Sequence, residues 1–136
     1  MHPMIAATIL VVDDNAFVLN TISTGLKHAG FHVLTARSPD EALQAGARHP
    51  GPIDLILLDV ILPGMDGLKL ASEFTRLHPE SRSLFMTGLP DTSQVAEQIV
   101  SRGLAFLAKP FLPQVLARKV REVLSAPAVR VMGAKG

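Results

Sequence analysis

The chain lacks cysteine altogether, and its 136 residues include no long apolar run. Without cysteine there is no disulfide, no zinc–thiolate site and no catalytic thiol. No apolar stretch approaches the roughly 20 residues that a membrane-spanning helix needs, and the first residues lack the basic and apolar segments of a signal peptide. A net charge of +1 gives no electrostatic reason to bind DNA or an anionic membrane. We therefore expect a cytoplasmic protein without direct nucleic-acid or membrane partners.

The composition is that of one folded domain. Hydrophobic residues make up 48% of the chain and charged residues 18%, which argues against disorder. A chain of this length suits a single domain and buries about two-thirds of its unfolded surface on folding. We predict a single domain over residues 1–136, with a core at about 8–124 and a tail poor in structure at 126–136.

Short apolar runs alternate with helical patterns along the chain. The runs predict strands at 9–12, 32–36, 53–58, 84–86 and 105–108. A helical pattern follows each of them. The first helix is predicted at 16–28 and ends before Gly30, the second begins with a capping box at Ser38-Pro39-Asp40-Glu41, and the fourth is expected at 91–101, before Gly103. The segment 59–67 is predicted to be a loop.

Five strand–helix units in succession predict a parallel sheet covered by helices on both faces. Right-handed crossovers restrict the topology to a few arrangements. Of the two common doubly wound strand orders, five strands fit the flavodoxin-like one. The predicted fold class is therefore α/β, a flavodoxin-like doubly wound (βα)5 domain with a five-stranded parallel sheet in the order 2-1-3-4-5.

Polar residues follow four of the five predicted strands. They are Asp13 and Asp14 after the first strand, Asp59 after the third, Thr87 after the fourth and Lys109 after the fifth. In the predicted order, strands one and three flank the point where strand order reverses, and ligands bind there. Three nearby carboxylates repel one another unless a cation intervenes. Mg²⁺ suits this role, since it takes one or two carboxylates, keeps waters and bridges to phosphate.

A carboxylate can also act as a nucleophile toward phosphorus and form an aspartyl phosphate. A lysine and a hydroxyl at the same edge can then stabilise the phosphoryl oxygens. Each residue alone has an ordinary structural explanation: an Asp-Asp pair can cap a helix, and Thr87 can simply end a strand. Asp66-Gly67 is best explained as a turn before the third helix, and we assign it no chemistry.

The motifs together resemble the response-regulator receiver family from about Thr8 to Leu124. They are the ILVVDD strand end, LLDVILPGMDG around Asp59, FMTG around Thr87, and Lys109-Pro110-Phe111. The resemblance implies a phospho-acceptor receiver domain of a two-component system. Its partners would be a sensor histidine kinase or histidine phosphotransfer protein and a downstream protein that the sequence does not name.

The resemblance also assigns roles at the acidic end. Asp59 would accept the phosphoryl group. Mg²⁺ would be bound by Asp14, Asp59 and the backbone carbonyl of Ile61, with Asp13 acting through water.

Three further roles come from the same family. Lys109 would pair with the acids or the phosphoryl group. Thr87 would move toward the phosphoryl group, and Phe106 would be the aromatic switch that follows it. The face made by the fourth helix, fifth strand and fifth helix would then change. We thus expect a phosphorylation-dependent switch rather than an enzyme.

Two alternatives concern function and context. Phosphatases of the haloacid-dehalogenase type also use an Asp nucleophile with Mg²⁺, but their motif is Asp-x-Asp after the first strand. Here the candidate nucleophile follows strand three, Ile61 stands two residues on, and no cap-sized insertion is present. Separately, FLPQVLARKVREVL resembles the last helix of receivers fused to hybrid histidine kinases, so both a single-domain regulator and a kinase segment fit the sequence.

Overall fold

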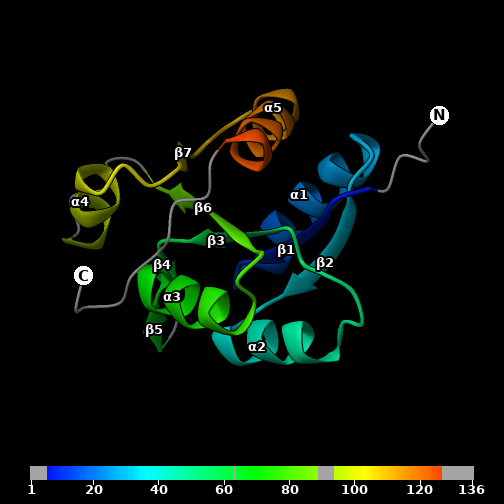
Figure 1. The fold of residues 1–136 in the computed structure, drawn as a ribbon. Helices are drawn as coiled ribbons and strands as arrows, with labels where there is room; N and C mark the ends of the chain where they lie inside the picture. Colours follow the sequence, from blue (N-terminus) through cyan, green and yellow to red (C-terminus); the bar gives the residue numbers. More distant parts are fainter. Residues whose placement is uncertain (1–5, 63, 89–93, 127–136) are drawn as a thin grey trace.

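The computed structural model describes residues 6–62, 64–88 and 94–126. Within these residues one parallel sheet has the order β2-β1-β3-β6-β7 (Figure 1). Counted along the chain, these five strands lie in the order 2-1-3-4-5, so the predicted fold class is confirmed. Their bounds are β1 (Thr8–Val12), β2 (His32–Ala36), β3 (Leu55–Asp59), β6 (Arg82–Thr87) and β7 (Phe106–Ala108).

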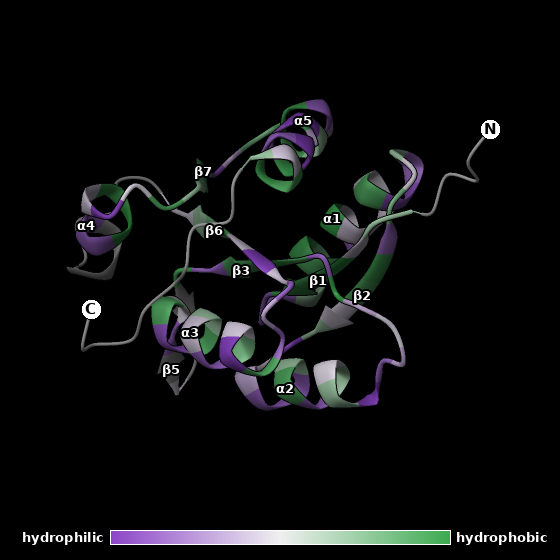
Figure 2. Cartoon of the chain, in the orientation of Figure 1, coloured by the Kyte–Doolittle hydropathy of each residue, from purple (hydrophilic) through white to green (hydrophobic). Residues whose placement is uncertain are grey.

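Helices cover both faces of the sheet. In Figure 1, α1 and α5 lie on one side of it and α2 and α3 on the other. Their bounds are α1 (Ala16–His28), α2 (Pro39–Arg48), α3 (Gly67–Leu77), α4 (Gln94–Ser101) and α5 (Pro113–Ser125). α2, α3 and α5 each carry both hydrophobic and hydrophilic stretches in Figure 2, as helices with one buried side do.

The apolar strands separate two hydrophobic clusters. Leu10 and Ile56 point toward α2 and α3, whereas Ile9 and Leu55 point toward α1 and α5. All four side chains are buried. Because both faces of β1 and β3 are covered, these strands have no polar alternation, which is why they appear in the sequence as continuous apolar runs.

Local signals determine the helix ends. The Asn15 side chain accepts a hydrogen bond from the first turn of α1 and caps it. Gly30 follows with a φ of 98°, and the N–H groups of Gly30 and Phe31 bond to carbonyls of the last turn. Gly103, with a φ of 68°, and Leu104 end α4 in the same way. Glycine tolerates this left-handed conformation, so both predicted helix ends are confirmed.

The predicted capping box of α2 is formed in part. The Ser38 hydroxyl accepts from the Glu41 backbone N–H at 3.1 Å, and Pro39 occupies the first turn. The Glu41 carboxylate, however, accepts from the N–H of Arg37 at 2.9 Å, one residue before the cap. The cap therefore still satisfies a backbone donor on each side of the helix start.

The third strand begins at Leu55 rather than at Ile53 as predicted. Asp54 joins three strands instead: its N–H bonds to the Thr8 carbonyl at 2.9 Å and its carbonyl accepts from Arg82 at 3.0 Å. Its carboxylate also accepts from the Thr8 N–H at 2.7 Å. Elsewhere β6 begins two residues earlier than predicted and β7 one residue later.

Some predictions fall outside the described residues. They include the tail at 127–136 and the first three residues, 91–93, of the predicted fourth helix. Among the helices that the structure describes, none has the length and apolar character to cross a membrane.

Candidate functional site

The predicted polar residues lie at one edge of the sheet. Asp13 and Asp14 follow β1, Asp59 ends β3, Thr87 ends β6 and Lys109 follows β7. Since these strands are parallel, their carboxyl ends share an edge. The structure therefore places all five residues at the carboxyl-terminal edge of the sheet, called here the rim.

Lys109 connects two of the strands at the rim. Its ammonium nitrogen lies 2.6 Å from Asp59 Oδ2 and 3.4 Å from Asp13 Oδ2. Its backbone N–H bonds to the Thr87 carbonyl at 2.7 Å, which holds the start of this segment beside β6. Two carboxylates and one ammonium thus form a partly buried ionic cluster.

The two carboxylates of this cluster change the pKa of the Lys109 ammonium. Burial lowers the pKa of the Lys109 ammonium, but the hydrogen bond and charge of Asp59, followed by those of Asp13, outweigh burial and raise the pKa above its ordinary value of 10.5. Lys109 is therefore positively charged throughout the physiological range. It offsets part of the repulsion between the two carboxylates.

The neighbouring acids Asp13 and Asp14 have different surroundings. Asp13 is only 2% exposed. Its Oδ1 accepts from the Asn15 N–H at 2.9 Å while its Oδ2 faces Lys109. Asp14 is exposed to solvent. The structure thus joins Asp13 to Asp59 through Lys109 but leaves Asp14 outside this ionic cluster.

The oxygen atoms at the rim fit Mg²⁺ in kind. Mg²⁺ prefers carboxylate, carbonyl and water oxygens and needs only one or two protein carboxylates. Asp13 and Asp59 supply two carboxylates, both of which contact the Lys109 ammonium. Across residues 6–62, 64–88 and 94–126, no three histidine or carboxylate side chains gather closely enough to hold a metal ion. The ligand roles of Asp14 and of the Ile61 carbonyl stay predictions.

The loop after Asp59 contains a short hairpin that we did not predict. β4 (Ile61–Leu62) and β5 (Met65–Asp66) pair antiparallel. Gly64, between them, has a φ of 80°, which suits the tight reversal. Strands of two residues carry no periodicity, so only the Pro-Gly pair in the sequence pointed to a turn here.

The turn assigned to Asp66-Gly67 proves to be the start of α3. The Asp66 carboxylate accepts from the Lys69 N–H at 2.7 Å and caps the helix. Gly67 is the first helical residue, and its N–H bonds back to the Val60 carbonyl at 2.6 Å. This bond joins the two residues that flank the hairpin and so closes its base.

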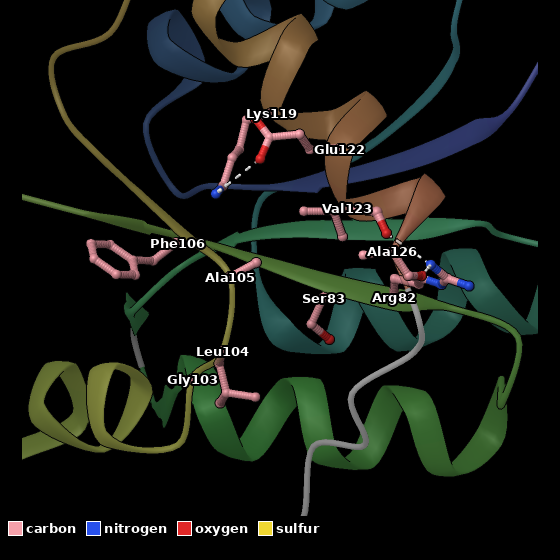
Figure 3. Close-up of a pocket in the computed structure, with 10 residues that line it drawn as sticks. All are labelled: Arg82, Ser83, Gly103, Leu104, Ala105, Phe106, Lys119, Glu122, Val123 and Ala126. Carbon is pink, nitrogen blue, oxygen red and sulfur yellow. Dashed lines mark hydrogen bonds and ion pairs between the residues drawn. The ribbon is translucent and has the colours of Figure 1, made fainter.

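The two predicted switch residues lie on adjacent strands. Thr87 is buried, at 6% exposed, whereas Phe106 is 40% exposed. The register aligns Thr87 with Ala108, two residues beyond Phe106 on β7. In Figure 3 the Phe106 ring extends from the strand away from the α5 residues. Phe106 thus lies in an outward position in this structure.

A hollow of about 410 Å³ lies beside the same strands (Figure 3). Its lining includes Phe106, Ser83, Lys119 and Glu122. On its α5 side the Arg82 guanidinium donates to carbonyls at the end of the helix, those of Val123, Leu124 and Ala126. None of the rim residues lines this hollow, which belongs to the edge formed by β6, β7 and α5.

A doubly wound five-stranded sheet whose rim joins two aspartates to a lysine places the chain in the flavodoxin-like class of α/β domains. Within that class the family is clear. The chain belongs to the response regulator receiver domain family, whose model its sequence matches over residues 9–121. The chain is thus a receiver domain of the kind found in two-component signalling, and the haloacid-dehalogenase alternative is not favoured.

Individual relatives differ in length. The sensor kinase CckA of Brucella abortus (strain 2308) is 32% identical over 119 residues, which cover 88% of this chain but 13% of the kinase. The response regulator receiver protein CpdR of the same organism is 29% identical over 121 residues, covering 87% of this chain and 97% of that protein. A receiver domain structure from Clostridium thermocellum has a TM-score of 0.76 at 28% identity, covering 87% and 94% of the two chains. The chain therefore spans a small part of the first relative and nearly all of the second.

Proposed function

We propose that Asp59 accepts a phosphoryl group from the phosphohistidine of a sensor histidine kinase or histidine phosphotransfer protein. A carboxylate oxygen of Asp59 would attack phosphorus while the N–P bond breaks; the ring nitrogen keeps the electron pair and the imidazole takes up a proton from water, leaving an aspartyl phosphate and a neutral histidine. The observation that carries this proposal is the 2.6 Å ion pair between Lys109 and Asp59 at the switch point of the sheet. The chain would act as a signalling switch rather than as an enzyme with its own substrate.

The residues of the rim suit this transfer. Asp59 lies at the end of β3, and its side chain is 20% exposed, so a donor can approach it. The Lys109 ammonium would offset the negative charge of the phosphoryl oxygens. Mg²⁺, when bound by Asp14, Asp59, the Ile61 carbonyl and a water on Asp13, would neutralise further charge on those oxygens.

The transfer can be tested by intact-mass measurement. With acetyl phosphate and Mg²⁺, the wild-type chain should gain a single phosphoryl group. Asp59→Asn should gain none, because an amide lacks the nucleophilic oxygen anion. Asp54→Asn is the matched control, since Asp54 precedes the same strand and its carboxylate binds a backbone N–H. An adduct on Asp59→Asn equal to that of the wild type would refute the assignment.

The signal would travel through Thr87 and Phe106. A phosphoryl group on Asp59 adds acceptor oxygens near the end of β6, where the Thr87 hydroxyl can donate. A charge-assisted hydrogen bond is worth roughly 1.5–3 kcal/mol, enough to shift a two-state equilibrium by about one to two orders of magnitude. Phe106 has no hydroxyl, so moving its ring inward costs no polar desolvation. The face made by α4, β7 and α5 would then present a changed surface to a partner.

Beryllofluoride, an acyl-phosphate mimic, provides the test of this relay. Backbone chemical-shift changes should extend from Asp59 through Thr87 to Phe106 and α4. In Thr87→Ala they should stop near Asp59, since the hydroxyl that responds is gone. Changes confined to the acidic residues in the wild type would mean that the output arises by another route.

Both contexts of the relatives remain compatible with this function. In a short protein such as CpdR the domain is nearly the whole chain, whereas in the CckA kinase it is one part. The proposed partners are the same kind of phosphodonor in each case. The two contexts differ in whether the phosphodonor belongs to the same chain as the receiver domain.

A further inference from the structure

Gly67 approaches the backbone of the proposed phospho-acceptor more closely than a side chain would allow. A Cβ atom built on Gly67 would lie 2.4 Å from the Asp59 carbonyl oxygen and 2.9 Å from the Val60 carbonyl oxygen. Ordinary van der Waals contact for a Cβ begins at 3.4 Å. Both neighbours are backbone atoms, which cannot rotate away as the end of a flexible side chain can.

Backbone conformation does not explain this glycine. The described glycines with positive φ are Gly30, Gly64 and Gly103, so Gly67 has a conformation open to any residue. Glycine is also a poor helix former, and Gly67 begins α3. Local preferences therefore favour another residue at this position, and the close contact with Asp59 is the physical reason for glycine.

The end of β3 is held by β6 and by the start of α3. Asp59 pairs with Met86 of β6 across the sheet. The Gly67 N–H bonds to the Val60 carbonyl at 2.6 Å. A new methyl group here would push against Asp59 and Val60 while this bond still holds them near.

We propose that Gly67 is a positioning residue for the phosphoryl transfer: its missing side chain lets α3 press against the Asp59 backbone and fixes where the acceptor carboxylate lies. This inference rests on the proposed function of Asp59. Moving a built Cβ from 2.4 Å to ordinary contact requires a displacement of about an ångström. A misplacement of that size in a reacting group can lower a rate by about 100-fold.

Two other glycines provide matched controls. Gly88 follows Thr87 at the rim, and a Cβ there meets nothing within 4 Å. Gly46 lies on α2, where a Cβ would meet His78 Nε2 at 2.6 Å and Phe74 Cε1 at 2.8 Å, at the opposite end of α3 from Gly67. Gly88→Ala therefore adds a methyl group near the site without a clash, and Gly46→Ala adds a clash away from the site.

The experiment measures three quantities for each variant: the free energy of unfolding, the rate of phosphorylation by acetyl phosphate with Mg²⁺, and the ¹³C resonance of the Asp59 carboxyl without Mg²⁺. Gly67→Ala should phosphorylate roughly 100-fold more slowly per folded molecule and should shift the Asp59 resonance. Gly46→Ala should lose stability yet keep the wild-type rate and resonance. Gly88→Ala should change none of the three.

The proposal is wrong if Gly67→Ala keeps the wild-type rate and resonance, or if Gly46→Ala slows the reaction as much at equal stability. Should Gly67→Ala unfold, it is remade with Ser81→Ala, which removes a buried hydroxyl without a partner among the described residues and so should stabilise the fold. If the double variant also fails to fold, Gly67 is required for folding itself, and the positioning role is overturned. If the wild type accepts no phosphoryl group, the proposed function fails, whereas the resonance still tests the positioning by Gly67.

Discussion

Two aspartates at the two ends of β3 have opposite surroundings. Asp54 precedes the strand and uses its carboxylate to accept a backbone N–H from β1 at 2.7 Å. Asp59 ends the strand, and its carboxylate meets the ammonium of Lys109 at 2.6 Å. One carboxylate is thus bound to the backbone of the sheet and the other to a flexible side chain.

The difference distinguishes a structural acid, Asp54, from the acid that we propose to be reactive, Asp59. A carboxylate bound by a backbone N–H would leave that donor without its acceptor if it changed its partner. A lysine side chain can move a short distance and keep its charge close, so an incoming phosphoryl group can share it. Under the proposed function, the same residue type thereby serves stability just before β3 and chemistry at its end.

The largest expected effect is on stability. Asp54→Ala should lower the free energy of unfolding by about 2 to 3 kcal/mol, because the buried Thr8 N–H loses a charged acceptor. Asp59→Ala should change it by less than about 1 kcal/mol, since Lys109 keeps Asp13. Urea unfolding of both variants measures the difference. A larger loss of stability in Asp59→Ala than in Asp54→Ala would contradict the distinction between the two aspartates.

Metal affinity should show a smaller effect. Asp14→Ala should weaken Mg²⁺ binding by roughly tenfold, because a direct carboxylate ligand is lost. Asp13→Ala should weaken it less, because Asp13 is predicted to act through water. Calorimetric or NMR titration compares the two, and equal losses would count against separate ligand roles.

The smallest effect concerns pH. Because the Lys109 pKa is raised above 10.5, its charged form stabilises the folded chain fully below that pH, and this contribution is lost as pH rises through the folded-state pKa. The wild type should exceed Lys109→Met in stability by about 1 kcal/mol near neutral pH. Unfolding curves should show this gap closing above about pH 10.5. A gap that is constant across the range would mean that packing, not charge, accounts for it.

Much of the fold was readable because its signals are local. Asn15 and Gly30 mark both ends of α1, and the buried strands are continuous apolar runs. The rim followed from strand order alone, since parallel strands bring Asp13, Asp59 and Lys109 to one edge. Such features can be predicted from the sequence because each depends on a few adjacent residues or on a general rule of topology.

What the sequence did not reveal depends on contacts between distant residues. In the sequence Asp54 is simply a polar residue within the predicted strand 53–58, yet its side chain accepts a hydrogen bond from β1. Arg82 begins β6, and its side chain reaches the end of α5, a contact across about forty residues of chain. Gly67 gave no signal beyond a turn because the need for glycine lies in the Asp59 carbonyl facing it. Side-chain contacts and close backbone contacts between distant residues leave no recognisable pattern in the sequence.

Locating the phosphoryl group within the chain tests the central claim most directly. Borohydride reduces an aspartyl phosphate to homoserine, and peptide mass spectrometry then identifies the converted position. After acetyl phosphate and Mg²⁺, we predict homoserine at Asp59 alone, with Asp13, Asp14 and Asp54 unchanged. Conversion at any of those three, or none in a folded chain, would contradict the account.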